Sequence, residues 1–307
     1  MESRQVQVSE ELFARISPDL ELCYQTIGDP GDPAILLIMG LGGPMTWWDL
    51  GFCRMLAERG LFVIRYDNRD TGRSSRLRGR VTRAMLVRAF TGRPVTAPYL
   101  LSDLEEDAVA LLDELGIEAA HVVGLSMGGM IAQTLAIAHP DRVLSLTSVM
   151  SSVGRRTVGW QSPRILPAVL APRRPGRASY TRTSARLWRL IGSPSYPLQR
   201  EEVLARAEET FDRGWTPAGV LRQMLAIAMQ PDRSSDLARV TVPTLVIHGS
   251  ADRMVHVSGG RATAAAIPGA ELMLVEGMGH DLPAPLYRSL VTAIVRNVRR
   301  ADPVADT

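Results

Sequence analysis

Short apolar runs alternate with helical patterns along most of the 307-residue chain. Runs such as AILLIM and TLVIH are almost continuously aliphatic, which is typical of strands buried on both faces of a sheet. Parallel strands need helical crossovers, and the intervening segments have that pattern. The alternation therefore predicts an α/β fold with a mostly parallel central sheet flanked by helices. The expected strands cover residues 21–26, 35–39, 62–66, 121–125, 143–149, 244–248 and 271–275, with one more edge strand within 5–16.

Helices are expected where apolar residues recur at helical spacing between these strands. In the segment SDLEEDAVALLDELG, Ser102 is predicted to cap the first turn, Glu105 to complete a capping box and Gly116 to end the helix. The expected helices of the α/β part cover residues 48–59, 102–115, 127–138, 259–266 and 285–298.

The strand pattern stops between residues 153 and 236, where helical patterns follow loops rich in Pro and Arg. A helical insertion that interrupts an α/β domain indicates a cap over a site. We therefore expect a core made of residues 1–152 and 237–307, and an inserted helical cap made of 153–236. The expected cap helices lie near 182–191, 201–211 and 217–229, and a smaller irregular insert near 76–99 is expected to border the site.

Composition excludes several classes of function. The net charge is only +3 and all 35 basic residues are arginine, which indicates a coding bias rather than a nucleic-acid-binding patch.

Two distant cysteines, Cys23 and Cys53, fit no metal or redox spacing and favour a reducing compartment. The start MESRQVQVSEELF lacks a secretory pattern, and no apolar run reaches the roughly 20 residues that span a bilayer. We expect a soluble cytoplasmic protein with no membrane span and no nucleic-acid partner; a homo-oligomer stays open.

The sequence Gly124-Leu125-Ser126-Met127-Gly128 lies where one expected strand ends and a helix begins. In this nucleophile-elbow pattern, a sharp turn holds the serine in a strained backbone conformation with its hydroxyl above the sheet. The flanking glycines let strand and helix pass closely. By chance the pattern would occur in roughly 0.15 of chains with this Gly and Ser content, so its place at a strand-to-helix junction is what makes it specific. Ser126 is the predicted nucleophile.

A serine nucleophile needs a base, and His280 is in the best position among the five histidines. It lies in VEGMGHDLP, after the last expected strand, where a side chain can reach across the carboxyl edge of the sheet. His121 opens a strand at the opposite edge, and His139 ends a helix. His248 precedes the expected acid, and His256 is expected in a surface turn.

The acid should follow an earlier strand and reach the far imidazole nitrogen. Asp252 does so in TLVIHGSADRMV, four residues beyond the expected strand. Asp281 is the alternative because it adjoins His280, but the side chains of neighbouring loop residues generally diverge. We therefore favour Asp252. The order Ser126, Asp252, His280 is the one found in α/β hydrolases.

The glycine-rich loop Gly40-Leu41-Gly42-Gly43 follows an apolar strand, as a phosphate-binding loop would. It lacks the Gly-x-Gly-x-x-Gly spacing, and PMTWWDLGF follows it instead of a helix that starts at the third glycine. The spacing therefore argues against a nucleotide-dependent oxidoreductase.

Five motifs resemble those of the α/β-hydrolase superfamily over essentially the whole chain: IMGLGG, IRYDNRDTGRSS, HVVGLSMGGMIAQ, VTVPTLVIHGSADRMV and VEGMGHDLP. Within it, they look like the aclacinomycin methylesterase branch of polyketide-tailoring esterases. The resemblance implies a lidded serine esterase without metal or organic cofactor, with Ser126, Asp252 and His280 as the triad. It also implies an oxyanion hole made by the amides of Leu41 and Met127. Met39-Gly40 stands where many members have His-Gly. The contribution of this loop to the oxyanion hole is a backbone amide, which does not depend on the side chain at that position.

The expected function is hydrolysis of a carboxylic ester: a small to medium hydrophobic ester, a lactone or a polyketide methyl ester. The same triad could serve a cofactor-free perhydrolase, an aminopeptidase or a carbon–carbon bond hydrolase. Epoxide hydrolases and haloalkane dehalogenases normally place Asp at the elbow, so Ser126 argues against them. A non-catalytic ligand receptor on the same fold is a further alternative. The expected partner is a small hydrophobic ester.

Overall fold

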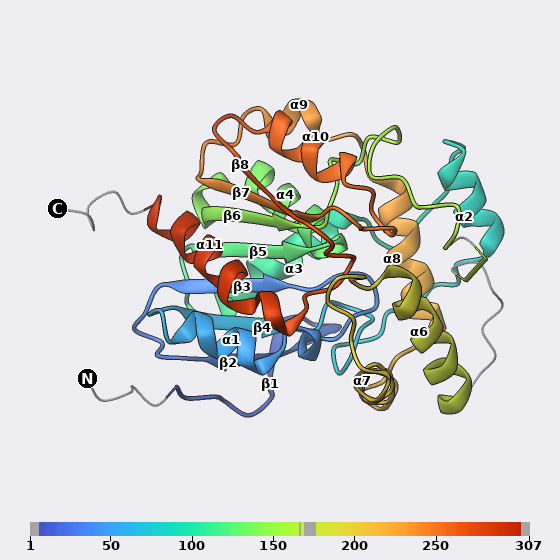
Figure 1. Ribbon diagram of the computed structural model, residues 1–307, viewed down its shortest axis with the longest axis horizontal. Coiled ribbons are helices and arrows are strands. Elements are labelled where there is room, and N and C mark those ends of the chain that lie inside the picture. Colours follow the sequence, from blue (N-terminus) through green and yellow to red (C-terminus); the bar gives the residue numbers. More distant parts are fainter. Residues whose placement is uncertain (1–5, 166, 169–175, 302–307) are drawn as a thin grey trace.

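The computed structural model describes residues 6–165, 167, 168 and 176–301. These residues form one eight-stranded sheet in the order β1-β2-β4-β3-β5-β6-β7-β8 (Figure 1). β1 pairs antiparallel with β2, and β2 antiparallel with β4; all other pairs are parallel. The strands are β1 Leu12–Ser17, β2 Leu20–Ile27, β3 Ala34–Ile38, β4 Phe62–Tyr66, β5 Ala120–Leu125, β6 Val143–Val149, β7 Thr244–Gly249 and β8 Glu271–Val275. The predicted α/β fold is confirmed.

Helices cover both faces of this sheet. One face carries α1 (Leu50–Ala57) and α11 (Tyr287–Arg299), which pack on each other. The other carries α3 (Leu101–Glu114), α4 (Met127–Ala138) and α10 (Ser258–Ala266). Strand β3 shows why its sequence is continuously apolar. Ile35 and Leu37 belong to the cluster under α1 and α11, whereas Leu36 and Ile38 belong to the cluster under α3 and α4.

Most expected elements appear with bounds shifted by a few residues. The edge strand expected within 5–16 corresponds to β1, Leu12–Ser17, while residue 5 lies outside the described residues. The helix expected at 48–59 is preceded by a short 3-10 helix, Met45–Trp47, and α1 starts only after Asp49, whose carboxylate accepts from the Gly51 amide at 2.8 Å.

The start of α3 differs from the prediction. The helix begins at Leu101, so Ser102 lies inside its first turn. Asp103 Oδ2 accepts from the Leu100 amide at 2.7 Å, and this carboxylate takes the place predicted for Glu105. Glu105 instead lies two residues beyond Asp103, on the buried side of the helix, 3.0 Å from His139 Nε2. The N-cap lies two residues earlier than predicted, at Leu100 instead of Ser102, and this shift places Asp103 instead of Glu105 at the helix end.

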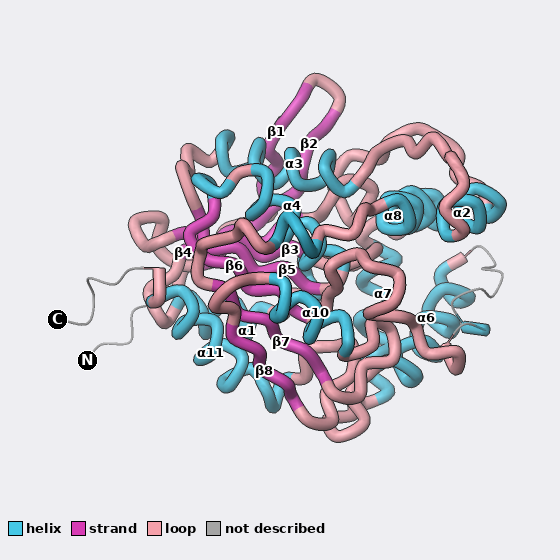
Figure 2. Tube along the Cα trace, turned by 90° about the horizontal axis from the view of Figure 1, so that it is seen from above, coloured by secondary structure: helices cyan, strands magenta, loops and turns pink. Residues whose placement is uncertain are grey.

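The segment between β6 and β7 contains four described helices: α6 Arg177–Ile191, α7 Arg200–Asp212, α8 Pro217–Met229 and the short α9 Ser234–Leu237. Figures 1 and 2 both place α6, α7 and α8 beyond one end of the strands, together with α2, Arg83–Phe90. The insert expected to be irregular at 76–99 thus contains a helix, which packs on α8.

Residues 166 and 169–175 of the expected cap, and 1–5 and 302–307 of the expected core, lie outside the described residues. Within the described part of the chain, each helix is too short or too polar to cross a membrane.

Candidate active site

Ser126 occupies a strained turn between β5 and α4. Its φ of 57° and ψ of −115° lie in a region that side-chain-bearing residues rarely adopt. The flanking glycines make this turn sterically feasible. A Cβ added to Gly124 would lie 2.1 Å from the Gly128 carbonyl oxygen, and one added to Gly128 would lie 2.0 Å from the Ile38 carbonyl oxygen. Strand, turn and helix are therefore in backbone contact, and only glycine fits at both positions.

The turn is held by backbone and side-chain hydrogen bonds. The Ser126 amide donates to the Val149 carbonyl of β6 at 2.8 Å. Its carbonyl accepts from Ser151 Oγ at 2.8 Å and from the amides of Gly129 and Met130 in α4. The next strand of the sheet thus fixes the orientation of the serine.

His280 lies in the loop after β8, as expected, and its Nε2 is 3.0 Å from Ser126 Oγ. The His280 amide donates to the carbonyl of Ile191, the last residue of α6, at 2.7 Å. A Cβ added to Gly279 would lie 2.5 Å from Ile191 and Gly192 backbone atoms, so the end of α6 lies directly against this loop. The histidine is buried, and it is positioned both by its own loop and by the end of α6.

Asp252 follows β7 and lies 2.7 Å from His280 Nδ1 through its Oδ2. Its Oδ1 accepts from the amides of Met254 and Val255 at 2.8 and 2.9 Å. Burial alone would raise the pKa of Asp252. The charge of His280 and the hydrogen bonds from His280 and His248 outweigh burial and hold this pKa below its usual range. Asp252 is therefore ionised and keeps the proton of the imidazole on Nδ1.

Asp281, the alternative acid, points elsewhere. Its Oδ1 accepts from Ser193 Oγ in the loop that follows α6, and burial raises the pKa of this carboxyl. Its Oδ2 is buried without a hydrogen-bond partner among the described residues. The carboxylate that faces the histidine is thus that of Asp252.

The other four histidines have separate local partners. His121 Nδ1 lies 2.9 Å from Ser145 Oγ inside the sheet, and His256 stacks on Trp160 with ring centroids 4.1 Å apart. His248 is fully buried, and its Nε2 lies 2.8 Å from the Val255 carbonyl and 3.5 Å from Asp252 Oδ2. His248 therefore lines the back of the Asp252 site, a position that its sequence context did not predict.

His139 belongs to a cluster with Glu105 and Glu106 whose ligand atoms lie within 4.8 Å of one another. His139 Nε2 is 3.0 Å from Glu105 Oε1 and 3.5 Å from Glu106 Oε1, so the cluster is explained as a contact between α3 and the end of α4. It lies apart from Ser126 in the fold, since it joins the far end of α4.

The glycine loop after β3 lies directly over the elbow. A Cβ added to Gly40 would be 3.1 Å from both the Leu125 carbonyl oxygen and Ser126 Cβ. Asn68 Nδ2 donates to the Met39 carbonyl at 2.9 Å, and the Met45 amide donates to Asp67 Oδ1 at 2.6 Å, so both ends of the loop are held. Among the described residues, the amides of Leu41 and Met127 have no hydrogen-bond acceptor.

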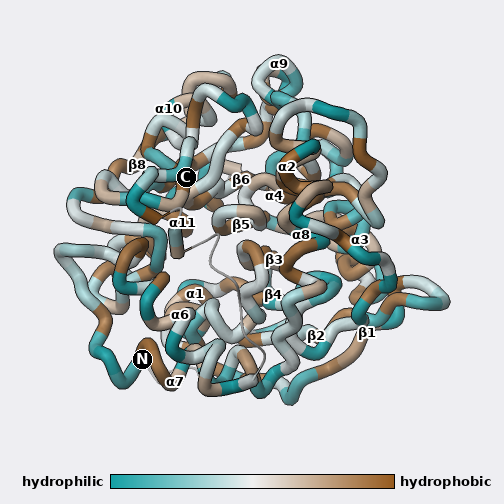
Figure 3. Tube along the Cα trace, turned by 90° about the vertical axis from the view of Figure 1, so that its right-hand side faces the viewer, coloured by the Kyte–Doolittle hydropathy of each residue, from teal (hydrophilic) through white to brown (hydrophobic). Residues whose placement is uncertain are grey.

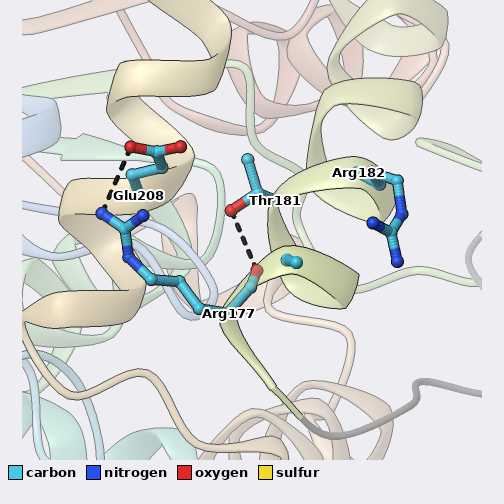
Figure 4. A pocket seen from close by; sticks show the side chains of 5 residues that line it. Arg177, Thr181, Arg182 and Glu208 are labelled. Carbon is cyan, nitrogen blue, oxygen red and sulfur yellow. Dashed lines mark hydrogen bonds and ion pairs between the residues drawn. The ribbon is translucent and has the colours of Figure 1, made fainter.

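An open pocket of about 320 Å³ lies between α6 and α7 (Figure 4). Arg177 lies across it, 3.2 Å from Glu208, and Thr181 donates to the Arg177 carbonyl at 2.9 Å. Its remaining lining residues are Ala178 and Arg182. No residue of the predicted triad lines this pocket, and its main charged groups pair with each other, so we do not assign it to the active site.

A serine on a strained turn after a central strand, with a histidine and a carboxylate from later loops at the same sheet edge, defines an α/β hydrolase. The chain belongs to that family: the family model of the alpha/beta hydrolase fold matches residues 33–283.

Similar proteins include esterases. Rhodomycin D methylesterase DauP of Streptomyces sp. strain C5 is 32% identical over 306 residues, which cover 92% of this chain and 96% of that protein. The 3-oxoadipate enol-lactonase 2 of Acinetobacter baylyi is 28% identical over 245 residues, or 79% of this chain and 80% of that protein. The crystal structure of a hydrolase from Pseudomonas aeruginosa matches with a TM-score of 0.72 and 26% identity, covering 94% and 98% of the two chains. The predicted resemblance to the aclacinomycin methylesterase branch of the α/β hydrolases is confirmed.

Sequence reasoning missed three side chains that hold the site. Ser151 supports the elbow, Asn68 supports the glycine loop, and Gln223 of α8 accepts from the Gly42 amide at 2.8 Å. Asn68 lies in one of the quoted motifs, IRYDNRDTGRSS, so a signal existed for it. Gln223 had none, because 181 positions separate it from its partner.

Proposed function

We propose that this protein is a serine hydrolase that cleaves carboxylic esters, with Ser126 as nucleophile, His280 as general base and Asp252 as the residue that orients the imidazole. The observation that carries this proposal is the continuous chain of contacts from Ser126 Oγ to His280 at 3.0 Å and from His280 to Asp252 at 2.7 Å. The amides of Leu41 and Met127 are the proposed oxyanion donors.

The reaction has two balanced steps. Ser126 Oγ attacks the ester carbonyl carbon while its proton moves to His280 Nε2, and negative charge collects on the carbonyl oxygen beside the two amides. The bond to the alcohol oxygen then breaks, and His280 gives its proton to the leaving alkoxide. Water attacks the acyl-enzyme with His280 again taking the proton, which returns to Ser126 Oγ as the carboxylic acid leaves.

The protein is a carboxylic ester hydrolase on its similarity to relatives named methylesterase and enol-lactonase. For its substrate we propose a small to medium hydrophobic ester, lactone or polyketide methyl ester. The apolar surroundings of the elbow support a hydrophobic acyl group, because Leu41 packs on a cluster that includes Met127, Val153 and Ala226. We propose residues 153–236 as the cap that covers this substrate.

Hydrolysis of short p-nitrophenyl esters and labelling by a fluorophosphonate test the proposal. We expect Ser126→Ala to abolish labelling and to lower kcat by at least about 1,000-fold, because the nucleophile is lost. Equal turnover in the wild type and in Ser126→Ala would overturn it. A folded wild type that fails to label would favour a ligand receptor.

A matched pair of variants tests which carboxylate orients His280. Asp252→Asn should lower kcat by about 10⁴-fold, because an amide at this position favours the wrong tautomer of His280. Asp281→Asn, next to the same histidine, should retain most of kcat. The reverse ranking would assign the orienting role to Asp281.

A further inference from the structure

We infer that Gln223 of the cap helix α8 is a positioning residue for catalysis, which holds the glycine loop so that the Leu41 amide faces the oxyanion. The inference rests on the proposed function and goes beyond it, because it makes the oxyanion hole dependent on a side chain from the cap.

Gln223 is fully buried, and each end of its amide group is bonded to the core. Oε1 accepts from the Gly42 amide at 2.8 Å, and Nε2 donates to the Arg69 carbonyl and to Thr71 Oγ1, both at 2.9 Å. Both Nε2 hydrogens are therefore used. The side chain joins the loop after β3 to the loop after β4, with a geometry that a rotated amide could not satisfy.

The rest of α8 keeps Gln223 in this place. Arg222 forms a buried two-bond pair with Asp70, with Nε–Oδ2 at 2.7 Å and Nη2–Oδ1 at 2.6 Å. A Cβ added to Gly219 would lie 2.5 Å from the Asp70 carbonyl oxygen, so helix and loop touch through their backbones. Val220 contacts Gly42, whose φ is 63°. Figure 3, which views the cap side, shows brown hydrophobic segments along α8.

The contact with Gly42 matters because Gly42 directly follows Leu41. The Gly42 amide donates to Gln223, so Gln223 directly restricts the peptide plane between Leu41 and Gly42, which adjoins the plane that carries the Leu41 amide. Without this acceptor, the partly buried Gly42 amide would lose its hydrogen bond, which would favour rotation of this loop. Such rotation would turn the Leu41 amide away from an oxygen above Ser126, while the Ser126–His280 contact would stay intact.

Gln223→Leu tests the inference, since it keeps the size of the side chain and removes its polar atoms. We expect kcat for p-nitrophenyl esters to fall by about 10- to 100-fold, which is less than the loss caused by removing an oxyanion donor altogether. KM should change by less than about threefold. A trifluoromethyl ketone, which forms a tetrahedral oxyanion on the serine, should bind more weakly by a similar factor. Gln223→Glu, which keeps an acceptor for Gly42, should recover part of kcat.

Gln133→Leu is the matched control. Gln133 is also fully buried and bonded, to Ser148 and Arg233, but it does not contact the glycine loop. The Gln133→Leu variant should be less stable than the wild type but should keep its kcat and its affinity for the trifluoromethyl ketone. If Gln223→Leu keeps kcat within about twofold, or loses kcat only together with a matching rise in KM, the inference is wrong. Turnover by Ser126→Ala would instead contradict the proposed function, so the two failures can be told apart.

Discussion

Glu105 shows how a single buried carboxyl couples stability to pH. It lies on the buried side of α3, and its Oε1 is 3.0 Å from His139 Nε2 at the end of α4. Burial raises its pKa to about 7, His139 opposes this rise, and Glu106 adds to it. Between the ordinary value of 4.5 and about 7, the folded protein binds more protons than the unfolded chain. The contribution of Glu105 to stability therefore falls as pH rises through this window.

Glu105→Gln should remove that pH dependence. A glutamine resembles the protonated acid, so we expect the variant to match the wild type near pH 5 and to exceed its free energy of unfolding at pH 8 by about 1 to 3 kcal/mol. Urea denaturation at the two pH values measures the difference. Glu106→Gln, in the exposed neighbour, should show no such gain. A variant equally destabilised at both pH values would mean that the bond to His139 dominates.

At the scale of elements, the charge pair of α8 differs in burial from the charge pairs between α6 and α7. In α8, Arg222 and its partner Asp70 are both buried, and Asp70 also accepts from Tyr99 at 2.8 Å. Between α6 and α7, Arg177 pairs with Asp212 and Glu208, but all three side chains are at least 44% exposed. Buried pairs are costly to break because one charge stays behind unpaired, whereas exposed pairs contribute little.

Arg222→Leu should therefore destabilise the protein by about 3 kcal/mol or more, and Arg177→Leu by less than about 1 kcal/mol. Urea denaturation of the full chain measures both. The double variant Arg222→Leu, Asp70→Asn should recover part of the loss, because no unpaired charge remains. Equal losses of stability in the two single variants would contradict this difference between buried and exposed charge pairs.

At the scale of the whole molecule, local patterns predicted the sheet and the elbow but not the contacts of the cap. Helix α4 has the bounds predicted for it, because Ser126 and the glycines on either side mark its start within a few residues. Helix α2 was missed, since Arg83–Phe90 is largely exposed and its stability comes from packing on α8. The place of Gln223 follows from how the cap docks on the core, which no short stretch of sequence encodes.

Hydrogen exchange across the whole chain tests how the cap is divided. Ala226 of α8 belongs to the large cluster under α3 and α4, whereas α6 and α7 share a small cluster of their own. We expect the amides of α8 to exchange about as slowly as those of the central strands, and the amides of α6 and α7 to exchange faster. Exchange of all three helices at one common rate would show that the cap opens as a single unit.

The pairing of β3 with β5 has a consequence for the size of the group that the site accepts. Ile38 lies opposite Gly124, and Leu41 and Met127 each follow three residues beyond this pair. Neighbouring strands are about 4.8 Å apart, a gap in which one oxygen can lie about 3 Å from a donor on either side. We propose that the Leu41 and Met127 amides keep about this spacing beyond the strand ends, so that the oxyanion hole fits a single oxygen atom. In this proposal, substitutions in the proposed cap would change which ester enters, while the spacing of the two amides stays fixed by the backbone.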